Sequence, residues 1–292
     1  MYAVEAQGLG KQFGSFSALR DCDLALPANK VIGLVGPNGA GKTTLLQLAA
    51  GLRYPTSGTI AVLGESPSAN DPALLARMSF VGQERPLYGD FSVADNLQVA
   101  RRLNLHWDHA YAIARVRRFG ISLDAKVRGL STGQRAQVAL AIAIGKRPEL
   151  LLLDEPVANL DPLARVDMLE ELMTTVAASG PTLIMSANAL ADVDRVCEYI
   201  VILTSGRVRL AGEIDEITAG HAFISGPRAE GIPAGWAVVD GREADRHGAW
   251  VLRADGARAP IEPRDNGTIA RSATLEEIVL AYLRSAATEA GS

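Results

Sequence analysis

Cysteine and long apolar runs are both scarce in this sequence. The 292 residues include two cysteines, Cys22 and Cys197, which lie far apart and lack the spacing of metal ligands. The longest apolar candidates lie at 138–144 and 199–203, whereas a membrane-spanning helix needs about 18–20 apolar residues. The N-terminus has no basic segment followed by an apolar run. These absences predict a reduced, cytosolic chain without a disulfide framework, a transmembrane span or a secretory leader.

Neither sign of charge dominates the composition. The chain has 29 Lys and Arg against 33 Asp and Glu, which gives a formal net charge of −4. A chain without a positive excess has no overall attraction to nucleic acid, so we expect no nucleic-acid partner. Hydrophobic residues make up 48% and charged residues 21%, which is ordinary for a globular protein and excludes the disordered and fibrous classes.

Short apolar runs alternate with helical patterns along most of the chain. Strands are predicted at 30–35, 150–153, 182–185 and 199–203, with helical periodicity between them and especially over 92–145. The four leucines at 150–153 are typical of a strand that is buried on both faces of a parallel sheet. This alternation predicts an α/β fold with a mainly parallel sheet.

The composition changes after about residue 217. The segment 220–266 is rich in Gly, Pro, Arg and Asp and contains two short apolar stretches. A final amphipathic helix is predicted at 275–286, where Thr274 and Glu277 have the spacing of a capping box. The sequence thus predicts a small C-terminal α+β appendage that ends in this helix and a disordered tail.

A glycine-rich segment follows the predicted strand at 30–35, and a helical pattern begins directly after it. The segment fits the phosphate-binding P-loop pattern and comprises Gly36, Pro37, Asn38, Gly39, Ala40, Gly41, Lys42 and Thr43, followed by Thr44. Glycines allow backbone N–H groups to converge on phosphate oxygens, and the helix adds its positive end. We expect Lys42 to reach the β- and γ-phosphates and the Thr43 hydroxyl to ligate Mg²⁺. The segment predicts a nucleoside triphosphate site.

An acidic pair ends the leucine strand, as in the Walker B motif. Asp154 lies at the strand end, where its carboxylate can hold Mg²⁺ directly or through water. Glu155 follows immediately and can polarise an attacking water molecule. A surface acidic pair is the alternative for such a dipeptide alone, but next to a P-loop the pair favours hydrolysis of the nucleotide.

A third motif, Leu130-Ser131-Thr132-Gly133-Gln134-Arg135, precedes a predicted helix. Ser131 and Gln134 have the spacing of a capping box, which already explains a good helix start. The same Ser hydroxyl, the Gly133 N–H and the helix N-terminus also provide an anion site. The segment resembles the LSGGQ signature of ATP-binding cassette (ABC) proteins, with Thr132 in place of the first glycine. The P-loop, signature and Walker B motifs occur in the family's order, and the resemblance covers about residues 1–217.

The resemblance implies the fold and the division of the chain. It implies a P-loop NTPase cassette of the ABC type, with a mainly parallel core sheet, an antiparallel β subdomain and an inserted helical subdomain at about 88–145. The nucleotide-binding domain would occupy 1–217. A small C-terminal accessory domain would occupy 218–292.

The resemblance also implies roles for further residues, with ATP and Mg²⁺ as the cofactors. Phe13 matches the aromatic residue that stacks on adenine, and Gln83 matches the glutamine that contacts Mg²⁺ and the attacking water. Asp161 matches an aspartate that communicates across a dimer. Ser131, Gly133 and Gln134 would complete the ATP site of a facing subunit, so that ATP joins a head-to-tail dimer.

One position departs from the family pattern. The family places a histidine after the strand predicted at 182–185, and Asn188 stands there in this chain. An Asn amide can donate a hydrogen bond to phosphate but cannot become a cation. Two interpretations stay open: hydrolysis persists with Glu155 as the main catalytic group, or the site is slow and acts as an ATP-dependent clamp.

The family resemblance implies an ATPase that powers transport through a separate transmembrane permease. The chain would be cytoplasmic and peripheral on the inner face of the cell membrane, as a homodimer or as a heterodimer with another ABC ATPase. The short C-terminal segment looks like that of exporter ATPases for drugs, antibiotics and polysaccharides, which favours export. The alternatives are a weakly hydrolysing regulatory half of an asymmetric heterodimer, suggested by Asn188, and a non-transport ABC ATPase.

Overall fold

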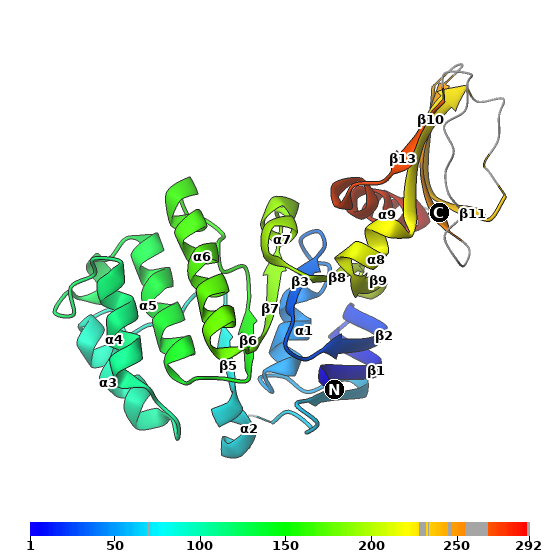
Figure 1. Cartoon of the computed structure of the whole chain (residues 1–292). Coiled ribbons are helices and arrows are strands. Elements are labelled where there is room, and N and C mark those ends of the chain that lie inside the picture. The colour runs from blue at the N-terminus through cyan, green and yellow to red at the C-terminus, as the bar shows by residue number, and fades with distance from the viewer. Residues whose placement is uncertain (69, 228–231, 233, 245–246, 255–267, 291–292) are drawn as a thin grey trace.

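A six-stranded sheet forms the centre of the protein (Figure 1). The structure is a computed structural model that describes residues 1–292 except 69, 228–231, 233, 245–246, 255–267 and 291–292. The strand order is β5-β6-β7-β3-β8-β9, and all neighbours are parallel except β8 and β9. The strands are β3 (Val31–Val35), β5 (Met78–Val81), β6 (Leu150–Leu153), β7 (Thr182–Ala187), β8 (Tyr199–Thr204) and β9 (Arg207–Glu213). The predicted α/β class and mainly parallel sheet are confirmed.

The leucine strand β6 is buried on both faces, as its continuous apolar sequence predicts. Leu150 and Leu152 pack into one hydrophobic cluster, and Leu151 and Leu153 pack into another on the opposite face. Successive side chains of a strand point to opposite faces, so apolar side chains are favoured at every position of a strand that is covered on both sides. The first polar side chain of this segment is Asp154, which directly follows the end of β6.

A second, three-stranded antiparallel sheet has the order β2-β1-β4. Its strands are β1 (Tyr2–Phe13), β2 (Phe16–Pro27) and β4 (Ser57–Val62). Helix α1 (Lys42–Ala49) contributes Leu45, Leu46 and Leu48 to the hydrophobic cluster that this sheet shares with the core sheet. Strands β1 and β2 each have 12 residues because they form one long hairpin.

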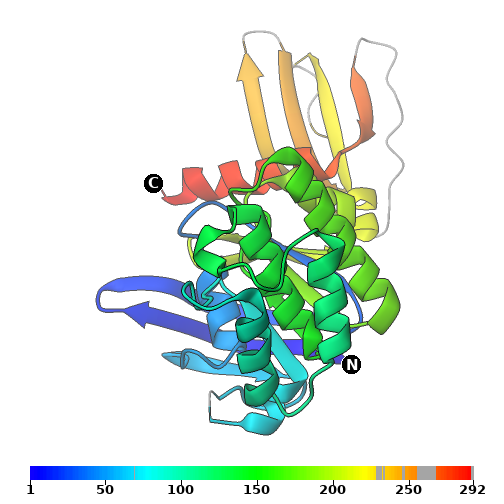
Figure 2. The ribbon, with the colours of Figure 1, turned by 90° about the vertical axis from the view of Figure 1, so that its left-hand side faces the viewer.

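A helical subdomain is inserted between β5 and β6, and in Figure 2 it faces the viewer. It contains α3 (Val93–Leu103), α4 (His109–Arg118), η1 (Val127–Gly129) and α5 (Thr132–Gly145). The short helix α2 (Pro72–Arg77) precedes β5. Ser92 caps α3 through a capping box with Asp95. Local sequence thus fixes where this subdomain begins, and its own hydrophobic cluster, centred on Val93, Leu97 and Val116, holds it together.

Helices α6 (Pro162–Ser179) and α7 (Leu190–Val196) cover the core sheet beyond the helical subdomain. Helix α6 begins at Pro162, because Asp161 caps it and a proline is well suited to the first turn. Its Glu171 forms an ion pair with Arg115 of α4, and both side chains are almost wholly buried. Arg118 reaches the same carboxylate at 3.2 Å. Residues 101–118 contain five arginines, and two of them are therefore engaged in contacts between helices.

The C-terminal segment forms a separate four-stranded antiparallel sheet that projects from the core (Figure 1). Its order is β11-β12-β10-β13. The elements are α8 (Ile214–Ala219), β10 (His221–Pro227), β11 (Trp236–Ala244), β12 (His247–Ala254), β13 (Ile269–Ser272) and α9 (Leu275–Ala290). Helix α9 continues past the predicted end at 286 as far as Ala290, so residues 287–290 do not belong to a disordered tail. The last two residues of that predicted tail lie outside the described residues.

Helix α9 packs against the core sheet as well as against its own sheet. Ile278 and Val279 share one hydrophobic cluster with Val35, at the end of β3, and with Ala187, at the end of β7. Tyr282 of the same helix contacts His221, whose Nε2 lies 3.1 Å from the tyrosine hydroxyl. The accessory elements and the core sheet are thus joined by one continuous apolar core.

The first turn of α9 contains the predicted capping box. The Thr274 N–H donates to the Glu277 carboxylate at 2.9 Å, and the Glu277 N–H donates to the Thr274 hydroxyl at 3.2 Å. Arg271 donates to both carboxylate oxygens of Glu277, at 2.8 and 2.5 Å. These donors, with Arg271 as the main cause, lower the pKa of Glu277 to about 2.

We expect Glu277→Gln to reduce the acid sensitivity of the accessory domain. The folded pKa of Glu277 is about 2 and an unfolded glutamate titrates at about 4.3, so its stabilisation is complete above the unfolded pKa and is lost as pH falls toward 2. Urea unfolding between these pH values, followed by Trp fluorescence, tests this, because Trp236 and Trp250 lie in the accessory sheet. Exposed Glu276→Gln is the matched control. The same pH dependence in Glu277→Gln and the wild type would contradict the prediction.

Candidate functional site

The glycine-rich segment lines a cavity of about 380 Å³ at the carboxyl edge of the core sheet. The loop joins β3 to α1, and its residues from Asn38 to Thr44 all line the cavity. The structure brings three further predicted residues to the same cavity, Gln83, Glu155 and Asn188. These come from the ends of β5, β6 and β7, which lie next to one another in the sheet beside β3.

The P-loop backbone has conformations that favour glycine. Gly39 and Gly41 have φ values of +80° and +107°. A Cβ at Gly41 would lie 2.6 Å from the Ala18 carbonyl oxygen, so the chain passes too close there for any side chain. No side chain caps α1 at Gly41, and the N-terminal N–H groups of the helix therefore remain for an anionic ligand.

The Lys42 side chain folds back into the P-loop. Its ammonium donates to the Gly36 and Pro37 carbonyl oxygens at 2.6 and 3.1 Å. Burial lowers the pKa of Lys42, and the carboxylates of Glu155 and Asp154 oppose that shift. The two neutral carbonyls and the nearby carboxylates offset the desolvation of the buried ammonium only in part, so the position favours a bound phosphate.

Asp154 and Glu155 are fixed by Ser186, a residue whose role the sequence motifs do not predict. The Ser186 hydroxyl donates to Asp154 Oδ1 at 2.7 Å and accepts from the Glu155 N–H at 2.8 Å. Asp154 is only 2% exposed. Ser186 lies near the end of β7, which pairs with β6, so the strand order brings this hydroxyl to the acidic pair.

The Glu155 carboxylate is held by two amides. Asn188 Nδ2 donates to Oε1 at 2.6 Å, and Gln83 Nε2 donates to Oε2 at 3.2 Å. Glu155 itself has a φ of +49°, an unusual conformation for a residue with a side chain. Asn188 therefore acts on the carboxylate that is predicted to activate water.

The signature residues lie outside this cavity. Ser131 caps α5 through a capping box with Gln134, with both reciprocal bonds at 3.1 Å. Ser131, Gly133 and Gln134 do not line the P-loop cavity, whereas Thr132 lines a separate cavity of about 400 Å³. Asp161 caps α6 by accepting from the Ala164 N–H at 3.0 Å. One copy of the chain thus does not bring its own signature to its own P-loop.

The predicted adenine-stacking residue is not part of the cavity lining. Arg53 and Lys11 lie over the ring of Phe13, with the Arg53 guanidinium carbon 4.8 Å and Lys11 Nζ 5.3 Å from the ring centroid. The aromatic residue that lines the cavity is Phe16, which is exposed. Phe13 ends β1 and Phe16 begins β2. The sequence alone does not show which of these two rings faces the P-loop.

Comparison with known proteins identifies the family. The family model described as "ABC transporter" matches residues 19–158. The nickel import ATP-binding protein NikO of Rhodobacter capsulatus is 38% identical over 239 residues, which are 76% of this chain and 93% of that protein. The chain belongs to the ABC transporter family of ATPases.

Two further comparisons agree with this membership. The Nod factor export ATP-binding protein I of Cupriavidus pinatubonensis is 34% identical to this chain over 209 residues. These residues are 70% of this chain and 64% of that protein. The solved structure of cbiO1 from Clostridium perfringens, part of the ABC transporter complex cbiONQ, is 26% identical. It has a TM-score of 0.64 and covers 75% of this chain and 91% of that one.

The chain belongs to a family of ATPases that bind ATP. The P-loop N–H groups, the buried Lys42 and the carboxylate of Glu155 lie around one cavity in an arrangement that suits phosphate binding and attack by water. The ABC ATPase differs from the family pattern at Asn188, and the structure gives this residue a definite contact with Glu155.

We expect Asn188→Leu to lower kcat about tenfold, because loss of a hydrogen bond to a charged group costs about 1.5–3 kcal/mol and leaves Glu155 less well oriented. Leu has a similar size but no donor. Asn188→His keeps a donor and should retain the rate. Steady-state hydrolysis of MgATP by both variants, with ATP affinity measured separately, tests this. A wild-type rate in Asn188→Leu, or a large loss in Asn188→His, would refute the role in orienting Glu155.

Proposed function

We propose that this protein is the ATP-hydrolysing subunit that powers a separate membrane permease, through an ATP-driven head-to-tail dimer. The observation that carries the proposal is the position of the signature. Gln83, Glu155 and Asn188 converge on the P-loop cavity, but Ser131 and Gly133 lie outside it. A second copy facing the first would bring its signature to the open side of the nucleotide.

The residues around the cavity support a division of labour for binding. Lys42 and the N-terminal N–H groups of α1 would hold the phosphates, and Phe16 would stack on the base in place of Phe13. Mg²⁺ would be held by Thr43, Gln83 and Asp154. Within the described part of the chain, no three His, Cys, Asp or Glu side chains gather as a metal site. The donors of Thr43, Gln83 and Asp154 still fit Mg²⁺, which commonly takes one or two carboxylates together with substrate phosphates and water.

Hydrolysis would depend on Glu155 as the general base. Its carboxylate lines the cavity, and Gln83 and Asn188 each donate to one of its oxygens. A carboxylate fixed in this way can accept the proton of an attacking water in a defined direction. When bound, Mg²⁺ would neutralise the charge that develops on the phosphate oxygens. These contacts support hydrolysis over the alternative of an ATP clamp.

We expect Glu155→Gln to bind ATP and accumulate as a dimer, because it keeps the shape of the site but lacks the base that consumes the nucleotide. Size-exclusion chromatography with light scattering, with and without MgATP, measures the association, and phosphate release measures hydrolysis. Ser131→Arg in the same background is the control, since it blocks the proposed contact across the dimer. A Glu155→Gln variant that stays monomeric with ATP and hydrolyses it normally would refute the scheme.

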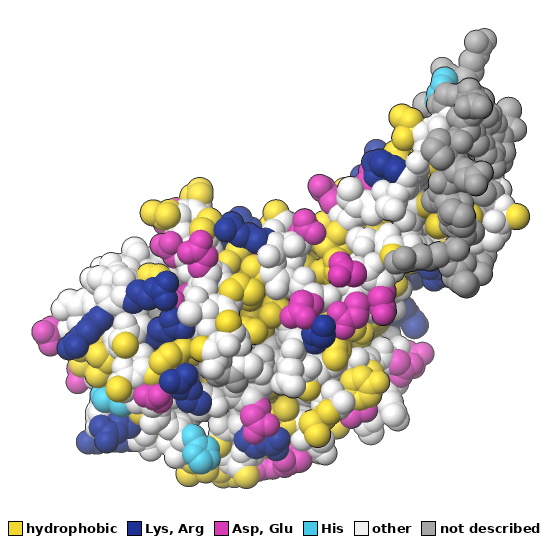
Figure 3. Space-filling model, viewed as in Figure 1, with side chains coloured by type: hydrophobic (Ala, Val, Ile, Leu, Met, Phe, Trp, Pro, Cys, Tyr) yellow, Lys and Arg dark blue, Asp and Glu magenta, His cyan; other side chains and the backbone are white. Residues whose placement is uncertain are grey.

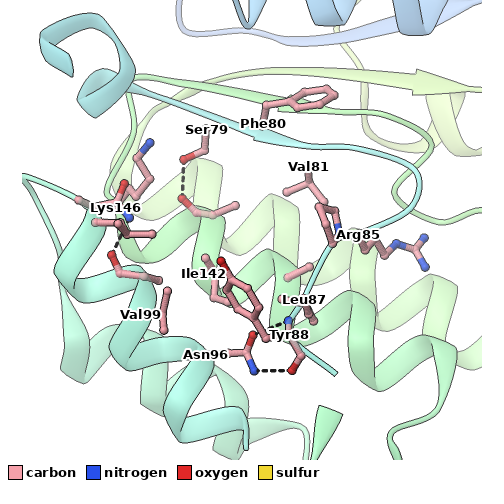
Figure 4. A pocket seen from close by; sticks show the side chains of 16 residues that line it. Ser79, Phe80, Val81, Arg85, Leu87, Tyr88, Asn96, Val99, Ile142 and Lys146 are labelled. Atoms are coloured by element: carbon pink, nitrogen blue, oxygen red, sulfur yellow. Dashed lines mark hydrogen bonds between the residues drawn. The ribbon is translucent and has the colours of Figure 1, made fainter. Parts of the chain in front are cut away.

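The permease is proposed as a separate chain that docks on the helical subdomain. No helix in the described ranges of this chain has the length and apolar character to cross a membrane. A largely apolar cavity of about 270 Å³ lies between the β5 segment and helices α3 and α5 (Figure 4). Leu87, Val99 and Ile142 line it, together with the aromatic ring of Tyr88. Such a cavity fits an apolar segment of a membrane protein on its cytoplasmic side. The ABC ATPase would therefore be cytoplasmic and peripheral on the membrane.

Charge gives the surface little preference for lipid. In Figure 3, Lys and Arg side chains lie interspersed with Asp and Glu side chains over the helices. Arg115 and Arg118 are paired with Glu171, so the Arg-rich stretch at 101–118 does not form one free basic face. Attachment to the membrane through a protein partner is better supported than attachment through anionic lipid.

We expect Leu103→Glu to weaken co-purification with the permease. Leu103 is 75% exposed and lines the apolar cavity of about 270 Å³, which we call the docking cavity. A charge at this position disfavours an apolar partner with little effect on folding. Leu105→Glu is the matched control, because Leu105 is 71% exposed and does not line this cavity. The experiment co-expresses the tagged chain with a candidate multi-span permease. No co-purification by the wild type, or equal loss in both variants, would contradict the proposal.

Export is proposed as the direction of transport. One relative is named as an export protein and another as an import protein, so relatives alone do not decide between the directions. Support for export comes from the short C-terminal segment, in which the sequence of residues 274–280 resembles the ending of exporter ATPases. ATP-dependent uptake by inside-out vesicles that contain the assembled complex would test the direction.

A further inference from the structure

Arg85 makes contacts that the proposed hydrolysis does not yet use. It lies in the same loop as Gln83, and its Nη2 donates to the Pro156 and Ala158 carbonyl oxygens at 2.8 and 3.2 Å. The Glu155 carbonyl oxygen is also near this nitrogen, at 3.5 Å. Three carbonyls of one short turn thus surround a single guanidinium nitrogen, and the turn begins at the residue that carries the catalytic carboxylate.

The turn that starts at Glu155 needs such a donor. Glu155 and Asn159 have φ values of +49° and +60°, and the Ala158 N–H closes the turn on the Glu155 carbonyl at 3.1 Å. Carbonyl dipoles that converge at the end of a turn leave a partial negative charge, which a cation stabilises. Burial lowers the pKa of Arg85, but arginine stays charged in proteins, so a full charge lies among these carbonyls.

The backbone at Arg85 is itself held in an unfavourable conformation. Its φ is +47°, and Pro86 follows it. A residue with a side chain rarely adopts this region, and a following proline restricts it further. The contacts to the 155–158 turn compensate for that cost. Strain that the surroundings maintain is frequent at functional sites.

Arg85 also borders the docking cavity. Arg85, Pro86 and Leu87 line it, and in Figure 4 the Arg85 side chain extends away from the cavity. Its backbone therefore belongs to the cavity wall, whereas its guanidinium reaches the turn behind Glu155. Gln83, two residues earlier in the loop, holds the Glu155 carboxylate directly. The loop that contains Gln83 and Arg85 thus contacts both the Glu155 carboxylate and the backbone that follows Glu155.

We propose that Arg85 is a positioning residue for ATP hydrolysis: it fixes the 155–158 turn, holds the Glu155 carboxylate between Gln83 and Asn188, and links the wall of the docking cavity to the site of hydrolysis. The inference rests on the proposed role of Glu155 as general base. Arg85 touches neither the P-loop cavity nor any of its predicted phosphate ligands. Loss of the guanidinium should therefore affect the rate of the chemical step more than the binding of ATP.

The test measures kcat, KM and the equilibrium affinity for ATP of the full chain in Arg85→Ala, Arg85→Met and Arg85→Lys. We expect Arg85→Ala and Arg85→Met to lower kcat about tenfold or more, since a small displacement of a catalytic group has effects of this order. ATP affinity should change by less than about twofold. Lys keeps a cation that can donate to carbonyls, so Arg85→Lys should recover part of the rate. If Arg85→Ala fails to fold, Arg85→Met, which keeps the apolar stem, is interpreted in the same way.

Arg128→Ala is the matched control. Arg128 lines the same 400 Å³ cavity as Arg85, but it pairs with Asp90 at 2.8 Å on the surface. We expect its kcat to equal that of the wild type. A wild-type kcat in Arg85→Met, or an equal loss in Arg128→Ala, would overturn the inference. A fall in ATP affinity as large as the fall in kcat would also overturn it.

A double variant separates this inference from the proposed function. If Arg85 acts through Glu155, adding Arg85→Met to Glu155→Gln should not lower the residual rate further. A further loss of the same size would show that Arg85 acts independently of Glu155. If Glu155→Gln hydrolyses ATP normally, the proposed function itself is wrong. If Glu155→Gln is inactive and Arg85→Met matches the wild type, only the inference about Arg85 fails.

Discussion

The parallel core sheet is the constraint on which the whole site depends. In a parallel sheet the carboxyl ends of all strands lie at one edge, so residues that follow different strands meet there. The order β5-β6-β7-β3 places Gln83, Glu155, Asn188 and the P-loop on neighbouring strand ends. The burial of the apolar strands fixes the positions of the polar residues that follow them.

The site is held by polar contacts among its own residues. Lys42 donates to loop carbonyls, Ser186 joins Asp154 to the backbone of Glu155, and two amides hold the Glu155 carboxylate. Amides do not titrate, so the Asn188 side chain stays a neutral donor, whereas a histidine at this position would change its charge near neutral pH. Preorganisation of this kind reduces the reorganisation that the chemical step requires.

The accessory domain is distinct in its sheet but continuous with the nucleotide-binding domain in its core. Val35 precedes the P-loop, and Ala187 precedes Asn188, and both belong to the same hydrophobic cluster as Ile278 and Val279 of α9. A boundary drawn along the chain at 217 therefore falls inside α8 and does not divide the apolar core. The contacts of α9 stabilise the same strand ends that position the catalytic residues.

Local sequence determined the elements whose stabilising contacts lie within a few residues. The P-loop glycines, the leucine strand before Asp154 and the capping boxes at Ser131 and Thr274 are all visible in short segments, because their hydrogen bonds or burial depend on near neighbours. Membership of the ABC family followed from the order of these motifs. The division into a parallel core, an antiparallel sheet and an inserted helical subdomain followed from that resemblance.

Only the tertiary structure decided which distant residues meet. Ser186 joins the acidic pair, Phe16 rather than Phe13 lines the cavity, and Arg85 reaches the turn after Glu155. Arg115 and Glu171 likewise pair across two helices that are far apart in the sequence. Such contacts depend on strand order, hairpin twist and helix packing. These are set by the burial of the whole apolar core, and no short stretch of sequence specifies them.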